Sequence, residues 1–237
     1  MKTVAIIPSA GKGLRLGLGK KPWVSVLGRP MLAHTLTAFE KCPVIGAVVV
    51  VSMSSDAGRI RKNIIKKYGF KKVASVVAGG KERQDSVRRG LDAAAAIDGK
   101  WDMVVVHDCA RPLVTPKLIN DTVMAAIKKG SAIAAVPLKD TVKEISGGTV
   151  KRTIPRDTLR AVQTPQAFKL PILKKAYETA GKDGFRATDC SSLVERLGKK
   201  IAVVEGSYEN IKITTQEDLA FAENILRRRS AKWRRGI

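Results

Sequence analysis

Short aliphatic runs alternate with amphipathic segments along most of this chain, and this alternation is the strongest restriction on its fold. The run 45–51 is largely β-branched and carries no charge, which is typical of a strand buried on both faces. Further strands are predicted at 5–7, 73–77, 102–106, 132–136 and 201–204, and 210–214 is a short strand-like run. Helical spacing of apolar residues predicts helices at 31–41, 55–68, 115–129, 171–180 and 189–197. This order predicts an α/β fold, with a mostly parallel sheet covered by helices on both faces.

The first apolar run ends in a loop, 9–21, that is rich in glycine, lysine and arginine. Glycine lets a backbone pass close to a ligand, and successive backbone N–H groups in such a loop can hold an anion. Leu16 stands where a dinucleotide-binding loop has its third glycine, and Lys21 follows Gly19-Lys20 where a Walker loop needs Ser or Thr. We therefore expect a cradle for a polyphosphate outside these two classes, with a solvated turn as the alternative.

Three polar segments, 9–21, 79–86 and 107–112, each follow a predicted strand. In parallel α/β sheets the carboxyl ends of the strands lie at one edge, and ligands bind there. Each segment contains glycine, arginine or both. Their convergence at that edge predicts a phosphate or nucleotide site.

The chain is strongly basic, with a formal net charge of +23. Such a charge favours anionic partners, which are either highly anionic small molecules or nucleic acid. Aromatic residues make up 5% of the chain, which weakens the case for base stacking. Small anionic ligands are therefore favoured over a nucleic-acid partner, and a solvated, lysine-rich surface without a specific partner is the remaining alternative.

The sequence lacks the usual signals for disulfides, metal sites and membranes. Its three cysteines are far apart and show no C-x-x-C spacing, and it has two histidines. We therefore expect neither a disulfide framework nor a metal held by protein ligands. No apolar run reaches the roughly 20 residues of a membrane span, and the apolar run after Met1 is too short for a signal peptide. These observations predict a cytoplasmic protein without a membrane partner.

The strand–helix alternation breaks at 137–156, where polar and β-branched residues alternate around Ser146-Gly147-Gly148. This pattern predicts a β-hairpin, which is expected to pack on a dimer partner, with a free arm as the alternative. We expect a single domain, 1–237, with this arm at about 137–157 and a basic C-terminal tail at about 227–237. The tail is expected to be a frayed, solvated helix end, and a nucleic-acid contact is the alternative.

Nine sequence blocks occur in an order that resembles one known family. They are Ser9-Ala10-Gly11-Lys12-Gly13-Leu14-Arg15, Lys21, Gly79-Gly80-x-x-Arg83-x-Asp85-Ser86-Val87, His107-Asp108-Cys109-Ala110-Arg111-Pro112, Asp140-Thr141-Val142-Lys143, Arg156, Gln163-Thr164-Pro165-Gln166-Ala167-Phe168, Thr188-Asp189 and Asn210-Ile211-Lys212-Ile213-Thr214. From about residue 3 to residue 226, the chain resembles the 2-C-methyl-D-erythritol 4-phosphate cytidylyltransferases of the non-mevalonate isoprenoid pathway. The resemblance implies a three-layer, Rossmann-like nucleotidyltransferase fold with an inserted β-hairpin dimerisation arm.

The resemblance also implies a reaction. CMP is transferred from CTP to 2-C-methyl-D-erythritol 4-phosphate, with Mg²⁺ or another divalent cation held mainly through the CTP phosphates. The substrate phosphate attacks the α-phosphate of CTP in line, so catalysis depends on positioning and on stabilising negative charge. The products are 4-diphosphocytidyl-2-C-methyl-D-erythritol and pyrophosphate. The expected state is a homodimer that exchanges its hairpin arms.

Each site residue is carried over by its place in the blocks. Arg15 and Lys21 are expected to stabilise the transition state, and Arg156 and Lys212 are expected to position the attacking phosphate. The expected contacts of CTP are Ser9, Ala10, Gly11, Gly13, Gly80 and Ser86. The expected contacts of the polyol phosphate are Asp108, Arg111, Thr141 and Thr164, and the resemblance implies that Thr141 and Arg156 come from the neighbouring subunit.

Structural roles are the alternatives at single positions. Ser86 would then cap a helix, Asp108 would be an N-cap, and Arg111 would be its salt-bridge partner. Lys20 stands where the family usually has proline, which changes the approach of the chain to Lys21. Two other functions stay open, namely a cytidylyltransferase for another polyol phosphate such as ribitol 5-phosphate, and a basic nucleic-acid-binding protein on this fold.

Overall fold

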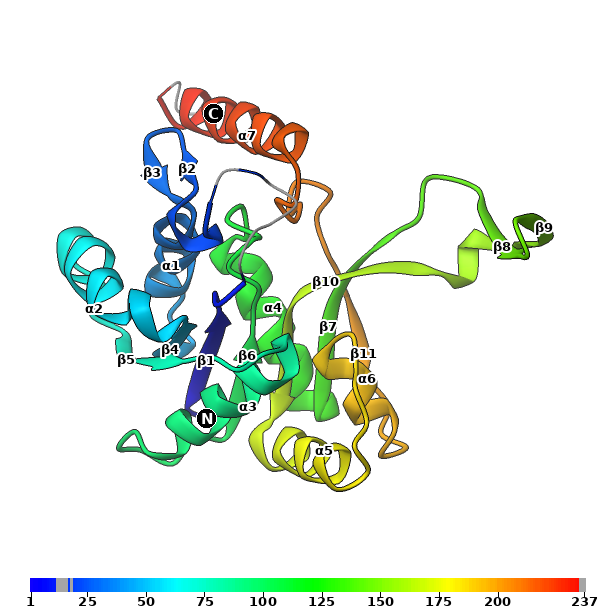
Figure 1. Cartoon of the computed structure of the whole chain (residues 1–237), viewed down its shortest axis with the longest axis horizontal. Helices are drawn as coiled ribbons and strands as arrows, with labels where there is room; N and C mark the ends of the chain where they lie inside the picture. Colours follow the sequence, from blue (N-terminus) through cyan, green and yellow to red (C-terminus); the bar gives the residue numbers. More distant parts are fainter. Residues whose placement is uncertain (12–16, 18, 235–237) are drawn as a thin grey trace.

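A seven-stranded sheet forms the centre of the computed structural model, which describes residues 1–11, 17 and 19–234. In order across the sheet, the strands are β11 (Ala202–Glu205), β7 (Ser131–Pro137), β10 (Arg160–Lys169), β6 (Met103–Val106), β1 (Thr3–Pro8), β4 (Ile45–Ser52) and β5 (Val73–Ala78). All of them except β10 run in the same direction, so the predicted mostly parallel sheet is confirmed. The carboxyl ends of the parallel strands therefore meet at one edge (Figure 1).

Strand β10 runs antiparallel between β6 and β7, and the sequence did not predict it. The stretch 163–168 contains Pro165, and a proline argues against a central strand. Pairing with β7 shifts at this point, between Val162 and Gln166. The side chains of Gln163 and Gln166 are buried, and both form hydrogen bonds, which is how polar residues are accommodated inside a sheet.

Helices cover both faces of the sheet. On one face α1 (Met31–Lys41) and α4 (Pro116–Lys129) pack against Ala5 and Ile7 of β1. On the other face Val4 and Ile6 pack with α3 (Arg83–Ala95), α5 (Leu170–Lys182) and α6 (Cys190–Glu195). The helix predicted at 55–68 forms as a 3-10 turn (Ser54–Asp56), α2 (Ala57–Ile60) and a π-helical segment (Arg61–Lys66). The result is the three-layer arrangement that the resemblance implied (Figure 1).

A smaller group of apolar residues, the third apolar cluster, joins the last helix to the loops at the carboxyl edge of the sheet. Its buried members are Val24, Val26, Met31, Ala110, Leu113, Ile213 and Ala222. Val26 belongs to a small ribbon of β2 (Ser25–Val26) and β3 (Arg29–Pro30), and Ala222 belongs to α7 (Gln216–Arg234). The cluster therefore ties α7 to chain segments next to the predicted site residues (Figure 1).

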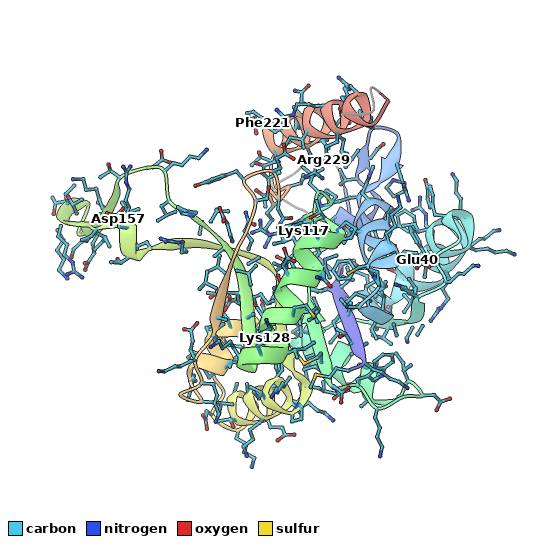
Figure 2. All side chains as sticks on the ribbon, turned by 180° about the vertical axis from the view of Figure 1, so that it is seen from behind. Glu40, Lys117, Lys128, Asp157, Phe221 and Arg229 are labelled. Carbon is cyan, nitrogen blue, oxygen red and sulfur yellow. The ribbon has the colours of Figure 1, made fainter. Side chains whose placement is uncertain are left out.

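Strands β8 (Val142–Ser146) and β9 (Thr149–Ile154) form the predicted hairpin, which projects from the body of the molecule (Figures 1 and 2). Gly147 and Gly148 have φ angles of 56° and 79°, as its two-residue turn requires. Ile145 and Val150 pair across the hairpin, and they are 57% and 60% exposed. A 3-10 turn (Arg156–Thr158) then leads back to β10. Within one chain, the arm leaves these apolar side chains exposed.

The C-terminal part of the chain differs from its prediction. Helix α7 continues to Arg234, and both Arg228 and Arg229 form ion pairs with Glu209. The expectation of a frayed, solvated end is therefore wrong for Arg229, whose side chain is 32% exposed, whereas the side chain of Arg228 is 62% exposed. Residues 210–214, which were expected to be strand-like, form an irregular segment. Within 1–11, 17 and 19–234, no helix is long and apolar enough to cross a membrane.

Candidate active site

A cavity of about 220 Å³, here named the first cavity, lies where the chain leaves β1, β5 and β6. Eight predicted site residues line it, namely Ser9, Ala10, Gly11, Lys21, Gly80, Ser86, Asp108 and Lys212. Gly13 and Arg15 lie outside the described residues. The polar segments that follow these strands therefore meet at one place, as the sequence predicted.

The two glycine-containing turns of the first cavity pack directly against each other. The Ser9 N–H and Oγ–H both donate to Val51 O, at 2.7 and 2.9 Å. The Gly79 N–H donates to Ser52 O at 2.7 Å, so both turns are fixed to the end of β4. A Cβ atom at Gly79 would lie 2.7 Å from Ala10 Cβ, and this close contact therefore requires glycine.

Ser86 holds the second glycine turn in place. Its Oγ accepts from the Gly80 N–H at 3.2 Å and donates to Glu82 O at 3.1 Å. The N-cap of α3 is Glu82, which forms a capping box with Asp85. The alternative in which Ser86 caps this helix is therefore wrong, and Ser86 instead forms part of the cavity wall.

Two consecutive lysines, Lys20 and Lys21, make different contacts at the C-terminal end of the loop 9–21. Lys20 Nζ lies 3.0 Å from Asp56 Oδ1 and 3.4 Å from Ser55 Oγ, just beyond the end of β4. Lys21 begins a 3-10 turn (Lys21–Trp23) and lines the first cavity. The Lys20–Asp56 pair therefore anchors the chain directly beside Lys21.

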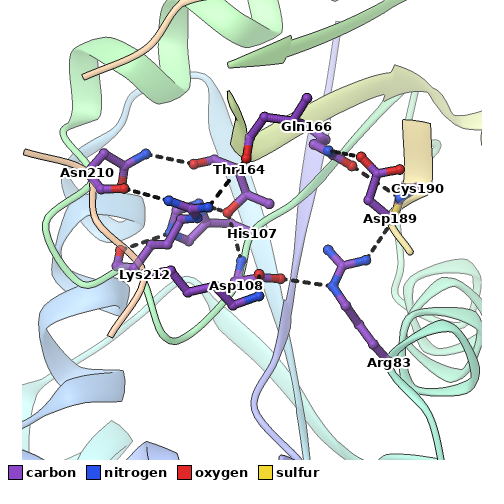
Figure 3. Close-up of polar contacts among 11 residues, drawn as sticks. Arg83, His107, Asp108, Thr164, Gln166, Asp189, Cys190, Asn210 and Lys212 are labelled. Carbon is purple, nitrogen blue, oxygen red and sulfur yellow. Dashed lines mark hydrogen bonds and ion pairs between the residues drawn. The ribbon is translucent and has the colours of Figure 1, made fainter. Parts of the chain in front are cut away.

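Asp108 lies at the centre of a charged group that also contains Arg83 and Lys212 (Figure 3). Its Oδ1 lies 3.0 Å from Arg83 Nε, and its Oδ2 lies 2.8 Å from Lys212 Nζ. Burial alone would raise the pKa of Asp108, but the two cations outweigh burial and hold this pKa well below its ordinary value. Arg111 Nη1 donates to Asn210 O at 2.7 Å, so the alternative that pairs Arg111 with Asp108 is wrong.

A second cavity, of about 430 Å³, adjoins the first and shares Arg83, Asp108 and Lys212 with it. The predicted substrate contacts Arg111 and Thr164 also line this second cavity. The shared charged side chains therefore stand where two spaces meet. Such an arrangement can bring the phosphates of two different ligands together.

His107 connects Thr164 to Arg111 beside the second cavity. Thr164 Oγ1 accepts from the Asp108 N–H at 3.1 Å, and it donates its own hydrogen to His107 Nδ1 at 3.0 Å because the other ring nitrogen faces a carbonyl oxygen, which can only accept. The other ring nitrogen, Nε2, then carries a hydrogen and donates to Arg111 O at 3.1 Å. Burial lowers the pKa of His107 to about 4, so the ring is neutral at pH 7. One neutral ring thus fixes the relative positions of two predicted site residues, Thr164 and Arg111.

Sequence reasoning assigned no catalytic or ligand-binding role to four further polar residues near the site, namely Arg83, Gln166, Asp189 and Asn210. Gln166 Nε2 donates to Asp189 Oδ2 at 2.7 Å, and Asn210 Nδ2 donates to Thr164 O at 2.8 Å (Figure 3). All four occur within the nine sequence blocks. Membership of the blocks could therefore have pointed to these four residues as part of the site. Their hydrogen-bond partners can be identified only in the folded chain.

Thr141 and Arg156 are not brought to either cavity within one chain. They flank the two strands of the arm, and Arg156 Nη1 donates to Lys139 O at 2.6 Å. The structure therefore separates these two predicted residues from the others. Their assignment to the site depends on a second subunit.

Thiol chemistry and metal chemistry each require particular side chains in a cavity. Cys109 lines the first cavity, and burial raises the pKa of its thiol to about 12, so it stays protonated and is not a nucleophile. In the part of the chain that the structure describes, no group of three or more His, Cys, Asp or Glu side chains is placed to hold a metal ion. The site is thus dominated by fixed charges, backbone turns and hydrogen bonds.

The fold and the paired cavities at the carboxyl ends of its strands define the class of this protein, which is a nucleotidyltransferase. The sequence model of the 2-C-methyl-D-erythritol 4-phosphate cytidylyltransferase family (IspD) matches residues 3–228. The chain belongs to this family.

Individual relatives agree with the family assignment. The 2-C-methyl-D-erythritol 4-phosphate cytidylyltransferase of Geotalea uraniireducens is 42% identical over 228 residues, which are 96% of this chain and 97% of the relative. The protein of the same description from Bacillus mycoides is 45% identical over 222 residues, or 93% of this chain and 96% of the relative. The crystal structure of 4-diphosphocytidyl-2C-methyl-D-erythritol synthase from Anaerococcus prevotii has a TM-score of 0.83 at 36% identity, covering 95% of this chain and 96% of that one. The resemblance seen in the nine blocks is confirmed.

Proposed function

We propose that this chain catalyses the reaction of its family. It transfers CMP from CTP to 2-C-methyl-D-erythritol 4-phosphate, forms 4-diphosphocytidyl-2-C-methyl-D-erythritol and releases pyrophosphate. The observation that carries the proposal is that two adjoining cavities share Arg83, Asp108 and Lys212. CTP enters the first cavity and the polyol phosphate the second, and the reacting phosphates meet at these charges.

The first cavity provides the contacts for CTP. Gly11 lines it, and Gly13 is assigned to the same cradle, where glycine lets the triphosphate approach the backbone. Ser9, Ala10, Gly80 and Ser86 form the wall beside the base and the ribose. Helix α3 begins at this cavity, and the positive end of its dipole favours a bound anion.

The chemical step is an in-line displacement at the α-phosphorus of CTP. A bond forms between an oxygen of the polyol phosphate and the α-phosphorus, and the bond from that phosphorus to the pyrophosphate oxygen breaks. Lys21 and Arg15 stabilise the negative charge that develops on the α-phosphoryl and leaving-group oxygens. Removing one charge-stabilising donor of this kind typically costs about 100-fold in rate.

The second cavity receives the polyol phosphate. Arg111 and Thr164 contact it from the cavity wall, and Lys212 holds the attacking phosphate. Asp108 fixes the position of Lys212 Nζ through their 2.8 Å ion pair. Thr141 of the partner subunit and Arg156 of the partner subunit complete the site in this proposal.

A divalent cation such as Mg²⁺ fits the first cavity mainly through the nucleotide. Mg²⁺ is usually bound by one or two carboxylates together with substrate phosphates. Asp108 and Glu82 are the acidic side chains that line the cavity, and Asp108 is already paired with Arg83 and Lys212. Bound with CTP, the ion would neutralise charge on the leaving pyrophosphate.

The active form in this proposal is a homodimer that exchanges its arms. The arm projects from the body and exposes Ile145 and Val150, which a second copy would cover (Figure 1). It also carries Arg156 away from the cavities of its own chain. Both observations support the supply of this arginine in trans.

Oxygen-18 labelling tests the proposed chemistry. The 4-phosphate of 2-C-methyl-D-erythritol 4-phosphate is labelled, the compound is incubated with CTP, Mg²⁺ and the enzyme, and the products are followed by ³¹P NMR and mass spectrometry. We expect all of the label in the diphosphate of the nucleotide product and none in the pyrophosphate. Label in pyrophosphate, or no consumption of CTP, would contradict the proposal.

A further inference from the structure

Helix α7 packs on the two loops that supply Asp108, Arg111 and Lys212 to the second cavity. Its Ala222 is buried in the third apolar cluster together with Ala110 and Ile213. Ala110 precedes Arg111 in the loop 107–115, and Ile213 follows Lys212 in the loop 206–215. The helix therefore lies against both loops although it does not line either cavity.

Arg229, in the second half of α7, is bonded to both of these loops. Its Nε and Nη2 lie 3.0 and 2.9 Å from Glu209 Oε2, in the loop 206–215. Its Nη1 donates to Leu113 O at 2.9 Å, in the loop 107–115. Figure 2 shows Arg229 between α7 and the rest of the molecule. One planar guanidinium thus bridges the loops, and the single ammonium of a lysine does not reproduce this geometry.

Asn210, the neighbour of Glu209 in the loop 206–215, connects the contact with Arg229 to the second cavity. Asn210 Nδ2 donates to Thr164 O at 2.8 Å. Asn210 O accepts from Arg111 Nη1 at 2.7 Å. The position of Glu209 therefore affects two residues of the second cavity.

Lys212 lies between two fixed points of the same loop. Before Lys212, Asn210 donates to Thr164 O. After Lys212, the Ile213 N–H donates to Ala110 O at 2.8 Å. The ion pair of Lys212 Nζ with Asp108 then spans the two loops that Arg229 also spans. The distance between the two loops therefore determines the position of the Lys212 ammonium group in the second cavity.

We propose that Arg229 is a positioning residue for the polyol phosphate, acting through Glu209 and Leu113 on the loops that carry Lys212 and Arg111. This inference rests on the proposed function, in which Lys212 holds the attacking phosphate. It gives a residue of the basic C-terminal segment, one position beyond the matched range 3–228, a role inside the enzyme. The proposed CTP contacts lie on the glycine turns, which are attached to β4 instead. The loops bonded to Arg229 also supply Asp108, Ala110 and Lys212 to the first cavity, so loss of Arg229 should affect the KM for CTP less than the KM for the polyol phosphate.

Kinetics of Arg229→Ala and Arg229→Lys test this inference, with Arg228→Ala as the matched control. Arg228 contacts the same carboxylate, at 2.5 Å from Glu209 Oε1, but its side chain is 62% exposed against 32% for Arg229. Within the described residues, Arg228 bonds to Glu209 and not to the loop 107–115. The KM values for CTP and for the polyol phosphate are measured separately, at a temperature where each variant is folded by circular dichroism.

We expect Arg229→Ala to raise the KM for the polyol phosphate about tenfold, because a shift of the loops by about 1 Å is costly in a preorganised site. The KM for CTP should stay within about twofold, Arg229→Lys should lie between Arg229→Ala and the wild type, and Arg228→Ala should resemble the wild type. Equal changes in both KM values, or equal effects of Arg228→Ala and Arg229→Ala, would overturn the inference.

Two further measurements keep the result unambiguous. If Arg229→Ala does not fold, Glu209→Gln and Arg229→Lys provide the same comparison of KM values, and an unchanged KM for the polyol phosphate in both would overturn the inference. The wild type is measured in the same assay. Failure of the proposed function would appear as an inactive wild type, whereas failure of the inference would appear as an active wild type with unselective variants.

Discussion

Lys212 Nζ and Asp108 Oδ2 lie 2.8 Å apart, although the two residues come from loops that follow different strands, β11 and β6. The other oxygen of the same carboxylate lies 3.0 Å from Arg83 Nε. Two cations are therefore held side by side by one anion, at the boundary between the two cavities. Without Asp108 they would repel each other, so this carboxylate organises the positive charge that a phosphate needs.

Asp108→Asn is expected to lower kcat about 100-fold and to reduce the free energy of unfolding by about 2 kcal/mol. The amide has nearly the same shape, but it leaves the partly buried Arg83 and the more exposed Lys212 without a counter-charge. Steady-state kinetics and urea unfolding measure the two effects. Asp121→Asn is the control, because it removes an exposed pair with Lys117 that should contribute less than about 0.5 kcal/mol. Similar losses in both variants would contradict the assignment.

The stability of the fold should increase with pH between about 4 and 6.5 through His107. Its pKa is 6.5 as an unperturbed group and about 4 in the buried site, so the unfolded chain binds the proton in this window. Stability is therefore lost as the pH falls through this range, by about 3 kcal/mol at pH 4. Urea unfolding of the wild type and His107→Gln at pH 4.5 and pH 7 measures this term. The same pH dependence in both proteins would rule out His107 as its source.

Asp56→Asn tests whether the contact with Lys20 positions the adjacent Lys21. Loss of the 3.0 Å ion pair is expected to lower kcat about fivefold, because Lys21 would then be less well placed toward the α-phosphate. The KM for the polyol phosphate should not change, since neither residue lines the second cavity. Asp183→Asn, which removes the exposed pair with Arg196, is the control. An unchanged kcat in Asp56→Asn would show that the anchor is not needed.

Arm exchange predicts that two inactive variants restore activity when they are combined. Arg156→Ala and Lys212→Ala should each be nearly inactive alone. After joint refolding, half of the dimers would be mixed, and each mixed dimer would contain one intact site. We therefore expect about one quarter of wild-type activity in the refolded mixture, and about one half in the mixed dimer after it is separated by two affinity tags. No recovery in the mixed dimer would mean that Arg156 does not act in trans.

The parallel strands could be predicted from the sequence because strands buried on both faces consist of aliphatic runs. Strand β10 could not, because Gln163 and Gln166 occupy buried positions in it. Their hydrogen-bond partners, Ser207 O and Asp189 Oδ2, come from distant parts of the chain. When such a partner is not known, sequence-based reasoning places a polar residue at the surface.

The first cavity was predictable for a different reason. The polar segments after β1, β5 and β6 had to meet, since parallel strands end at one edge. The charge pairing was not predictable, because local spacing favoured Arg111 as the partner of Asp108. In the fold Asp108 is paired instead with Arg83 from α3 and Lys212 from the loop before α7. Tertiary contacts of this kind leave no periodic signal in the sequence.

Release of pyrophosphate from CTP tests the central claim most directly, with 2-C-methyl-D-erythritol 4-phosphate and ribitol 5-phosphate compared in the same assay. A site shaped for the first compound predicts rapid release with it, at a kcat/KM at least about 100-fold above that for ribitol 5-phosphate. Equal or faster turnover of ribitol 5-phosphate would assign a different substrate. No release with either compound, together with salt-dependent binding to DNA, would contradict the assignment as a cytidylyltransferase altogether.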